Sequence, residues 1–401
     1  MFKTTNQTTP KAKKDTARFR RIQWGVGLTG ISVFAQLYLF QPLLPELGRT
    51  FSLSPAVSSL AVSAGTAGMA TGLFTLAFWA DRWPRKNLMS LSMFVAGGLT
   101  VLSAASPGFT TLVVFNFLKG MSIAGISAVA LAYLSEEVSA ASLGLVISLY
   151  LSGNILGGMS GRVAAGLLGS WIGWRGATFA IGIFGLALAF AFQRVLPKSN
   201  FFNSQKVRPA YKFRQMRSFL RRPRLLSLFI LAALMMGIFV SVYNYLNYRL
   251  EASPFSLPHY LIAFVYVMYT AGIGGSILAG RWSDSYSSSA VLKALLITLI
   301  IGLLMLLSGR IWIFILGLGI LTFGFFGAHT TASRWVSLLA TGGKSTATST
   351  YWLFYYVGSS IIGTLSGSFL SAWGWSIFVY CLMGLGVLTL VITLFVDDKD
   401  A

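Results

Sequence analysis

Long apolar segments separated by short polar connections recur along the whole chain. Each is about 20 residues long or longer, which is the length that a helix needs to cross the hydrocarbon core of a bilayer. Backbone groups in that core must be hydrogen-bonded within the protein, so we expect helices. The pattern predicts twelve transmembrane helices, at residues 22–46, 55–79, 87–106, 109–134, 142–168, 174–195, 225–249, 258–281, 289–308, 311–333, 345–370 and 375–396.

The twelve segments divide into two similar halves. Short pieces recur about 200 residues apart: 78–81 resembles 281–284, 157–161 resembles 363–367, and 173–174 resembles 374–375. Two parallel six-helix repeats are typical of transporters that rock about a site between their halves. We therefore predict five parts: a basic cytoplasmic tail at 1–21, a six-helix bundle at 22–195, a basic cytoplasmic linker at 196–224, a second six-helix bundle at 225–396, and a cytoplasmic tail at 397–401.

Composition agrees with a membrane protein. Of the 401 residues, 55% are hydrophobic and 10% are charged, whereas soluble proteins carry about 25% charged residues. The net charge of +21 comes from clusters in every second connection, at 1–21, 82–86 and 194–224. This distribution follows the positive-inside rule and predicts cytoplasmic termini and anionic lipid, not nucleic acid, as the charged partner.

Several other classes of protein are excluded by what the sequence lacks. The single cysteine, Cys381, allows no intrachain disulfide. The first apolar run, 24–44, is longer than the core of a cleaved signal peptide, so we expect it to be the first span. There is no Gly-x4-Gly-Lys-Ser/Thr motif for ATP, and two histidines without a mid-span acid make a poor active site. We expect neither an enzyme nor a cofactor or metal site.

The loop after the second span carries an acid followed by a basic cluster: Ala77-Phe78-Trp79-Ala80-Asp81-Arg82-Trp83-Pro84-Arg85-Lys86. It is similar to the loop motif of the major facilitator superfamily, Gly-x-Leu-Ala-Asp-Arg-x-Gly-Arg-Lys, and the resemblance covers nearly all of the chain. The resemblance implies a cytoplasmic clasp in which Asp81 engages Arg82, Arg85 and Lys86 and favours one access state, with Asp284 as its counterpart in the second half. Alternatively, the basic residues only set the topology.

The fifth span is rich in glycine. Gly153, Gly157 and Gly161 are four residues apart and form one groove into which another helix can pack. Together with Gly144 and Gly158, they resemble the antiporter motif Gly-x8-Gly-x3-Gly-Pro-x2-Gly-Gly of proton-coupled efflux pumps. This resemblance implies export, and the wider pattern at 133–137 and 152–162 is similar to that of bacterial inner-membrane efflux permeases. The alternative is glycine packing without a role in transport.

Two cations lie well inside predicted spans, namely Lys119 and Arg162. A charge there is costly, so its default interpretation is functional. Asn116 shares a helix face with Lys119, and Asn154 shares one with Arg162. We expect these four residues to line a central cavity of positive potential that favours an organic anion. Alternatively, Lys119 snorkels, and Arg162 caps backbone carbonyls or pairs with Glu46.

None of the ten acids lies in mid-span, so the usual proton-carrying carboxylate is missing. His329 in the tenth span is one candidate for proton coupling, because histidine titrates near neutrality. Lys119, whose charged form is disfavoured in the membrane interior, is the competing candidate. Tyr38 and Gln41 of the first span and Tyr245 of the seventh are candidates for cavity hydrogen bonds. A merely hydrogen-bonded histidine and interfacial tyrosines are the alternatives.

The sequence thus predicts an all-α, major-facilitator-like transporter of the bacterial inner membrane that works by alternating access as a monomer. The expected activity is proton-coupled efflux of a small organic molecule. A uniporter or importer of an organic anion, a lipid flippase and a sensor remain as alternatives.

Overall fold

The computed structural model describes residues 11–202, 209–340 and 342–396, and the regular structure within these ranges is helical. Residues 1–10 of the predicted tail, 203–208 of the linker and the tail at 397–401 lie outside the described residues. The first half contains α1 (Ala17–Leu37), η1 (Gln41–Leu43), α2 (Leu44–Phe51), α3 (Pro55–Ser58), α4 (Leu60–Trp79), η2 (Ala80–Arg82), α5 (Arg85–Ala104), α6 (Phe109–Glu137) and α7 (Ala140–Val195). The linker forms α8 (Pro209–Leu220), and the second half contains α9 (Pro223–Glu251), α10 (His259–Val265), η3 (Tyr266–Met268), α11 (Tyr269–Ser285), α12 (Ser288–Met305), α13 (Ile311–Leu339) and α14 (Lys344–Thr393).

The described residues hold ten helical segments long and apolar enough to cross a membrane, and two of these are double crossings. α7 has 56 residues, so as a straight helix it would span roughly 84 Å, against a hydrocarbon core of roughly 30 Å. Its helical geometry is broken at Gly173, with φ +72°, and α14 is broken at Gly374, with φ +75°. Glycine adopts this left-handed conformation without a steric penalty. The two breaks restore the predicted twelve crossings.

The first crossing differs from its prediction as a single helix over 22–46. α1 ends at Leu37 and is followed by the 3₁₀ turn η1 and the short α2. Pro42 and Pro45 each lie in the first turn of one of these pieces. Proline has no backbone N–H and clashes with the preceding turn, so a continuous helix cannot pass through both positions.

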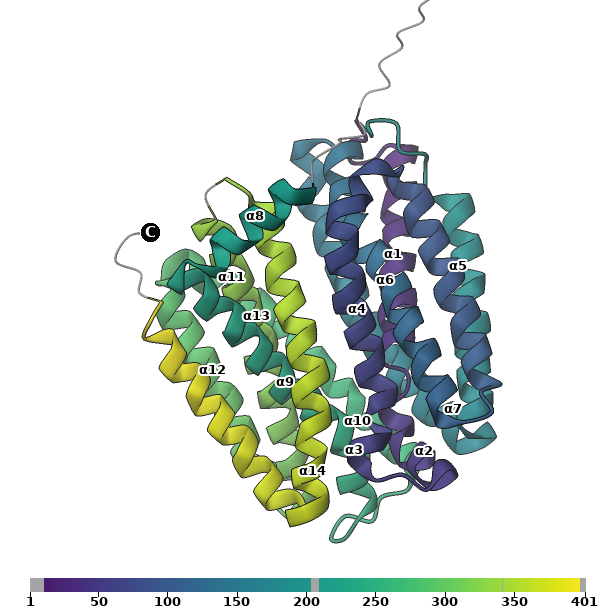
Figure 1. Cartoon of the computed structure of the whole chain (residues 1–401), viewed down its shortest axis with the longest axis vertical. Helices are drawn as coiled ribbons and strands as arrows, with labels where there is room; N and C mark the ends of the chain where they lie inside the picture. Colours follow the sequence, from purple (N-terminus) through teal and green to yellow (C-terminus); the bar gives the residue numbers. More distant parts are fainter. Residues whose placement is uncertain (1–10, 203–208, 341, 397–401) are drawn as a thin grey trace, which may run out of the picture.

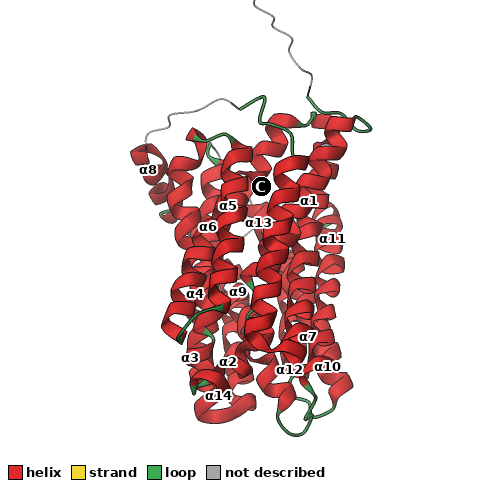
Figure 2. Ribbon diagram, turned by 90° about the vertical axis from the view of Figure 1, so that its right-hand side faces the viewer, coloured by secondary structure: helices red, strands yellow, loops and turns green. Residues whose placement is uncertain are grey.

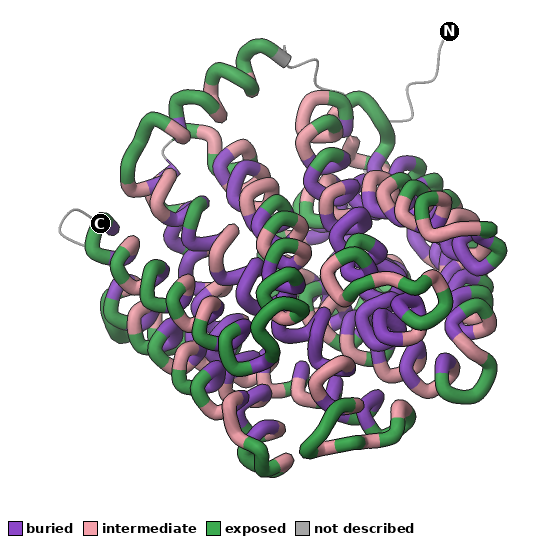
Figure 3. The backbone as a smooth tube through the Cα atoms, turned by 60° about the horizontal axis from the view of Figure 1, so that its bottom comes forward, coloured by how far each residue is buried: buried purple, intermediate pink, exposed green. Residues whose placement is uncertain are grey.

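The two halves lie side by side, with most helices running along the same direction (Figures 1 and 2). In Figure 1 the helices α1–α7 form the right half, α9 and α11–α14 form the left half, and the short α10 lies between them near α3. We call the end that carries 82–86 and α8 the basic end, at the top of Figure 1; the opposite end, with α2 and α3, is the far end. Buried residues lie between helices, and exposed ones face outward (Figure 3). Large apolar side chains such as Ile277 and Leu365 are among those exposed, as expected for a surface covered by lipid.

Direct contacts between the halves are found from the far end to mid-depth. At the far end Arg49 forms an ion pair with Glu251 (3.0 Å), and the Tyr248 hydroxyl donates to the Leu44 carbonyl (2.9 Å). Near mid-depth the hydroxyls of Thr66 and Ser360 are 2.7 Å apart. The halves are therefore closed at the far end.

Candidate substrate and coupling site

Arg162 lies at the junction of the two halves. It belongs to α7, and its side chain is buried. The guanidinium carbon is 4.4 Å from the ring centroids of both Tyr38, at the end of α1, and Tyr269, at the start of α11. Two aromatic faces, one from each half, thus stabilise the cation in place of water.

Hydrogen bonds from Arg162 also reach the second half. Its Nε donates to Gln41 Oε1 (2.6 Å), and Gln41 Nε2 donates to Asn244 Oδ1 on α9 (2.8 Å). Nη1 donates to the Gly158 carbonyl (2.6 Å). Arg162 thus caps a backbone carbonyl, as one alternative proposed, but Glu46 accepts from the Trp174 amide instead (2.9 Å). We call Arg162, Tyr38, Tyr269, Gln41 and Asn244 the Arg162 bridge.

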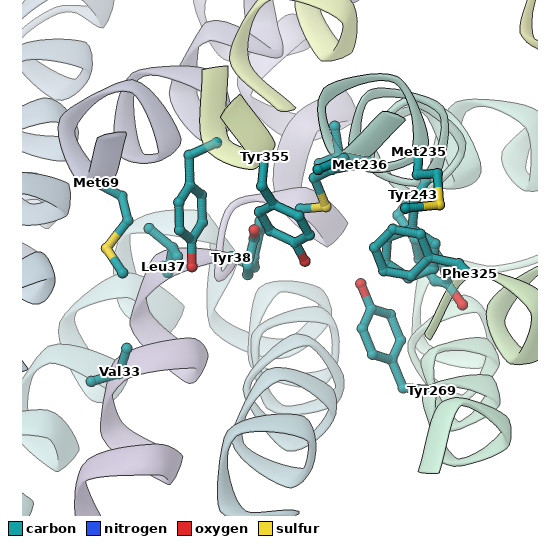
Figure 4. Close-up of a cluster of buried hydrophobic side chains, with 14 of the residues drawn as sticks. Val33, Leu37, Tyr38, Met69, Met235, Met236, Tyr243, Tyr269, Phe325 and Tyr355 are labelled. Carbon is teal, nitrogen blue, oxygen red and sulfur yellow. The ribbon is translucent and has the colours of Figure 1, made fainter. Parts of the chain in front are cut away.

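The second half contributes a cluster of aromatic side chains beside this bridge. The rings of Phe239 and Phe325 stack with centroids 3.9 Å apart, and Phe239 also contacts Tyr243 and Tyr269 edge-on or tilted. Figure 4 shows Tyr38 of the first half next to Tyr355 of the second, with Tyr269 and Phe325 nearby. Such rings offer flat apolar faces and hydroxyl groups to a planar organic molecule.

His329 belongs to this aromatic cluster. It lies on α13, is half-buried, and its Nδ1 is 2.9 Å from the Tyr351 hydroxyl. Its ring is 4.9 Å from that of Tyr355 and 5.0 Å from that of Trp352. Among the described residues, the imidazole therefore has the Tyr351 hydroxyl as its hydrogen-bond partner and aromatic rings around it.

Lys119 lies inside the first half without exposed surface. Its ammonium group is 5.1 Å from the centroid of the Phe40 ring and has no hydrogen-bond partner among the described residues. Asn116, one turn earlier on α6, donates to the Leu112 carbonyl (2.9 Å), and its Oδ1 has no such partner within the described ranges. In this conformation both polar side chains are buried among the helices of the first half.

The remaining two cavity candidates lie at helix contacts. Asn154 of α7 is half-buried, and its Oδ1 has no hydrogen-bond partner in the described part of the chain. Tyr245 is fully buried, and its hydroxyl donates to the Gly363 carbonyl (2.9 Å). Tyr245 therefore connects α9 to α14 within the second half in this conformation.

The glycines of the fifth span pack against α1. A Cβ at Gly157 would lie 2.5 Å from Ile31 Cα, and one at Gly161 would overlap Ala35 Cα. At Gly153 the nearest atom would be the Gly27 carbonyl oxygen, at 3.4 Å. The groove thus brings Arg162 on α7 close to Tyr38 and Gln41, which follow α1.

The loop at the basic end forms an ion-pair network centred on Arg85, which is buried. Arg85 Nη2 contacts Asp81 Oδ1 (3.1 Å) and Glu136 Oε1 (3.0 Å), and Nη1 donates to the Ala80 carbonyl (3.0 Å). Asp81 Oδ2 also accepts from Lys212 of α8 (2.7 Å). This network ties α4, α5 and α6 together.

The other basic-end residues contact different groups. Arg82 stacks over the Trp79 ring (4.3 Å), and Lys86 donates to the Gln193 and Leu196 carbonyls (2.8 and 2.6 Å) at the end of α7. In the second half, Asp284 pairs with Arg334 (2.7 Å) with both side chains exposed. Exposed pairs contribute little to stability.

Side chains of α4 and α14, which belong to different halves, line a crevice between them. Its volume is ≈ 350 Å³, and it begins beside Ser360, whose hydroxyl contacts Thr66. Its lining is mostly apolar and includes Ala70, Phe74 and Leu353.

Sequence reasoning missed several residues of this region, above all Tyr269, Phe239, Phe325 and Tyr355. One signal was available in the sequence. Tyrosines of membrane proteins are enriched at the two membrane–water interfaces. The run 351–356 instead places three tyrosines well inside a span.

Two six-helix halves with a polar and aromatic site at their junction define a multi-pass helical protein of the transporter class. The chain belongs to the major facilitator superfamily, since the sequence model described as Major Facilitator Superfamily matches residues 26–361. The predicted family and fold class are thereby confirmed. Members of this family are transporters, which in general are not enzymes.

Individual relatives agree with this assignment. The chain is 36% identical to the uncharacterized MFS-type transporter YybF of Bacillus subtilis (strain 168), over 90% of each chain. It is also 36% identical to the inner membrane transport protein YnfM of Escherichia coli (strain K12), over 91% of this chain and 87% of that one. Among solved structures, a bacterial homologue of the human lysosomal transporter Spinster, in an inward-facing and occupied conformation, matches with a TM-score of 0.75, 16% identity and 95% of each chain covered.

Proposed function

We propose that this protein is a secondary transporter of the bacterial inner membrane that exports a small organic molecule in exchange for protons, by alternating access. The observation that carries the proposal is the Arg162 bridge. In this bridge the mid-span cation Arg162 lies where the two halves meet, between Tyr38 of the first half and Tyr269 of the second. Contacts that join the halves at one end must break when the other end closes, so this cation can respond both to a ligand and to the conformational state.

The charge of Arg162 supports an anionic or carbonyl-bearing substrate. Its partners are neutral: the Gln41 amide, the Gly158 carbonyl and two tyrosine rings. In the described residues no carboxylate forms an ion pair with it. A substrate carboxylate could replace Gln41 as the acceptor, and the rings of Tyr38 and Tyr269 would stack on a planar substrate.

The closed far end supports a direction for loading. If the basic end is cytoplasmic, as the distribution of Lys and Arg predicts, the contacts at the far end close the side away from the cytoplasm. Substrate would then enter from the cytoplasm and displace Gln41 from Arg162. Loss of the Gln41–Asn244 and Arg162–Tyr269 contacts would release the far end and allow export.

Proton coupling is assigned to His329, with Lys119 as the competing candidate. His329 is partly exposed in this conformation, whereas Lys119 has no exposed surface, and this difference favours His329. The two are separated by comparing His329→Asn with Lys119→Met. The carrier is the residue whose substitution abolishes proton exchange but leaves downhill substrate movement intact.

The test is proton movement in everted membrane vesicles energised to an inside-acid gradient. Organic anions, amino acids, sugars and cationic dyes are added in turn, and substrate-induced proton release is expected for an aromatic or carboxylate-bearing compound. Arg162→Gln should lose this response. Arg175→Gln is the matched control, because Arg175 also stacks on a ring, that of Trp174 (4.4 Å), and bonds a carbonyl, that of Ala104 (2.8 Å), but within the first half. Equal responses from both variants would refute the role of Arg162.

The crevice between α4 and α14 supports a second candidate, movement of a lipid-like amphiphile. Its lining is apolar, and several of its residues, including Val357 and Ile361, are exposed. A molecule dissolved in the bilayer could enter there. Val357→Trp would narrow the crevice, so it should slow transport of a fluorescent phospholipid analogue but not that of a water-soluble organic anion.

A further inference from the structure

α8, in the linker between the halves, carries a charge that the transport site does not use. Residues 209–224 include six Lys or Arg and no Asp or Glu. Tyr211 and Phe213 are 52% and 51% exposed, and Arg214 and Arg217 are exposed with them. In Figure 3 this helix, joined to the grey linker trace, is mostly green. A basic helix with exposed aromatic rings has the composition of helices that lie in the membrane interface.

α8 is also attached to both halves at the basic end (Figure 1). Lys212 Nζ donates to Asp81 Oδ2 and to the Ala77 carbonyl, both at 2.7 Å, at the end of α4. On the other side, Gln215 Nε2 donates to the Gly342 carbonyl and Gln215 Oε1 accepts from Thr346, both at 2.6 Å, at the start of α14. α8 therefore spans the place where the two halves part.

A pocket of ≈ 260 Å³ lies between α8 and the loop before α14. Its lining includes Arg214, Arg222, Tyr211, Ser218 and Phe219. The Arg222 guanidinium lies over the Phe219 ring (5.5 Å), and the Ser218 hydroxyl donates to the Gln215 carbonyl (2.7 Å). Guanidinium and hydroxyl groups are the donors that proteins use for phosphate. None of the lining residues is acidic.

We propose that α8 is a docking site for an acidic phospholipid of the leaflet at the basic end. The lipid phosphate occupies the pocket between Arg214 and Arg222, and the rings of Tyr211 and Phe213 insert among the neighbouring headgroups. Charge complementarity selects this occupant, because a segment with six cations and no acid is attracted to an anionic surface. Since α8 is bonded to α4 and α14, the bound lipid also holds the connection between the halves.

The test is lipid retention by the full-length protein in detergent, measured by native mass spectrometry with phosphatidylglycerol and, separately, phosphatidylcholine. Phosphatidylglycerol should be retained preferentially. The Arg214→Gln/Arg222→Gln double variant should bind it roughly 100-fold more weakly, because each charge-assisted hydrogen bond to the phosphate contributes roughly tenfold. The matched control is Arg281→Gln/Lys293→Gln, which removes the same charge from the second half, outside the linker, and should bind as wild type.

Equal retention of both lipids, or equal weakening by both double variants, would overturn the proposal. Displacement of phosphatidylglycerol by millimolar glycerol phosphate would show a site for soluble phosphates and would overturn the lipid assignment. Arg214→Lys/Arg222→Lys, which keeps the charge, should retain most of the binding and guards against loss through misfolding. Retention does not depend on transport, so the outcome is independent of the proposed export function.

Discussion

The Arg162 bridge leads to a quantitative prediction for Arg162→Gln. The substitution removes the stacking of Arg162 on Tyr269, worth about 1–2 kcal/mol for a desolvated cation. It also removes the bond that orients Gln41 toward Asn244, worth about 1 kcal/mol in a membrane protein. The halves thus lose roughly 2–3 kcal/mol of contact free energy. The equilibrium between the states closed and open at the far end then shifts about 30- to 150-fold toward the open state.

Distance measurement across the far end can detect such a shift. Spin labels at Thr50 and Ala252, which are exposed beside the Arg49–Glu251 pair, would report opening by double electron–electron resonance in a Cys381→Ser background. A closed state favoured 100-fold in wild type would become about equal to the open state. Tyr269→Leu, which removes the stacking alone, should give a smaller shift in the same direction.

The control for this measurement is again Arg175→Gln, which alters an arginine of α7 whose contacts stay within the first half. It should leave the distance distribution unchanged. If folded Arg162→Gln protein gave the wild-type distribution, Arg162 would not couple the halves, and the reasoning would be refuted.

Three further predictions concern stability, each measured by thermal unfolding in detergent. Gly157→Val should destabilise the protein by about 1–3 kcal/mol, because even a Cβ at this position would lie 2.5 Å from Ile31 Cα. An unchanged unfolding temperature would contradict the close packing of α1 on α7. Arg85→Gln should lower the free energy of unfolding by about 1–3 kcal/mol, because Glu136 loses its charged partner. Arg85→Lys should lower it less, because it keeps the charge. Equal effects of the two variants would argue against the ion-pair network. Lys119→Met should leave the unfolding temperature unchanged or raise it, because the buried ammonium has no hydrogen-bond partner in the described part of the chain. A clear decrease would contradict this reasoning.

Much of the architecture could be predicted from the sequence because the bilayer imposes simple constraints. Hydrophobic length defines the spans, and the matching pairs Gly173-Trp174 and Gly374-Trp375 mark the turns before the sixth and twelfth crossings, where both glycines have positive φ. The helical break after Leu37 was less visible, although Pro42 and Pro45 provided the signal. α8 was not predicted, because a basic polar stretch has no apolar periodicity long enough to indicate a span.

For the candidate site, the sequence likewise predicted some of the residues but not the contacts that they make. The cost of a mid-membrane charge identified Lys119 and Arg162 from sequence alone. Sequence could not distinguish their surroundings, yet Lys119 lies within one half and Arg162 touches both. Nor could it pair Tyr269 with Arg162, since Tyr269 was not among the expected residues.

The sequence by itself therefore determined the number of crossings, the two halves and the positions of the costly charges, because these depend on transfer between water and lipid, residue by residue. Only the tertiary structure decided which polar and aromatic groups meet. Those contacts join α1, α7, α9 and α11 across more than 100 residues, and they depend on the depth and rotation at which each helix packs. Hydrophobicity alone fixes neither.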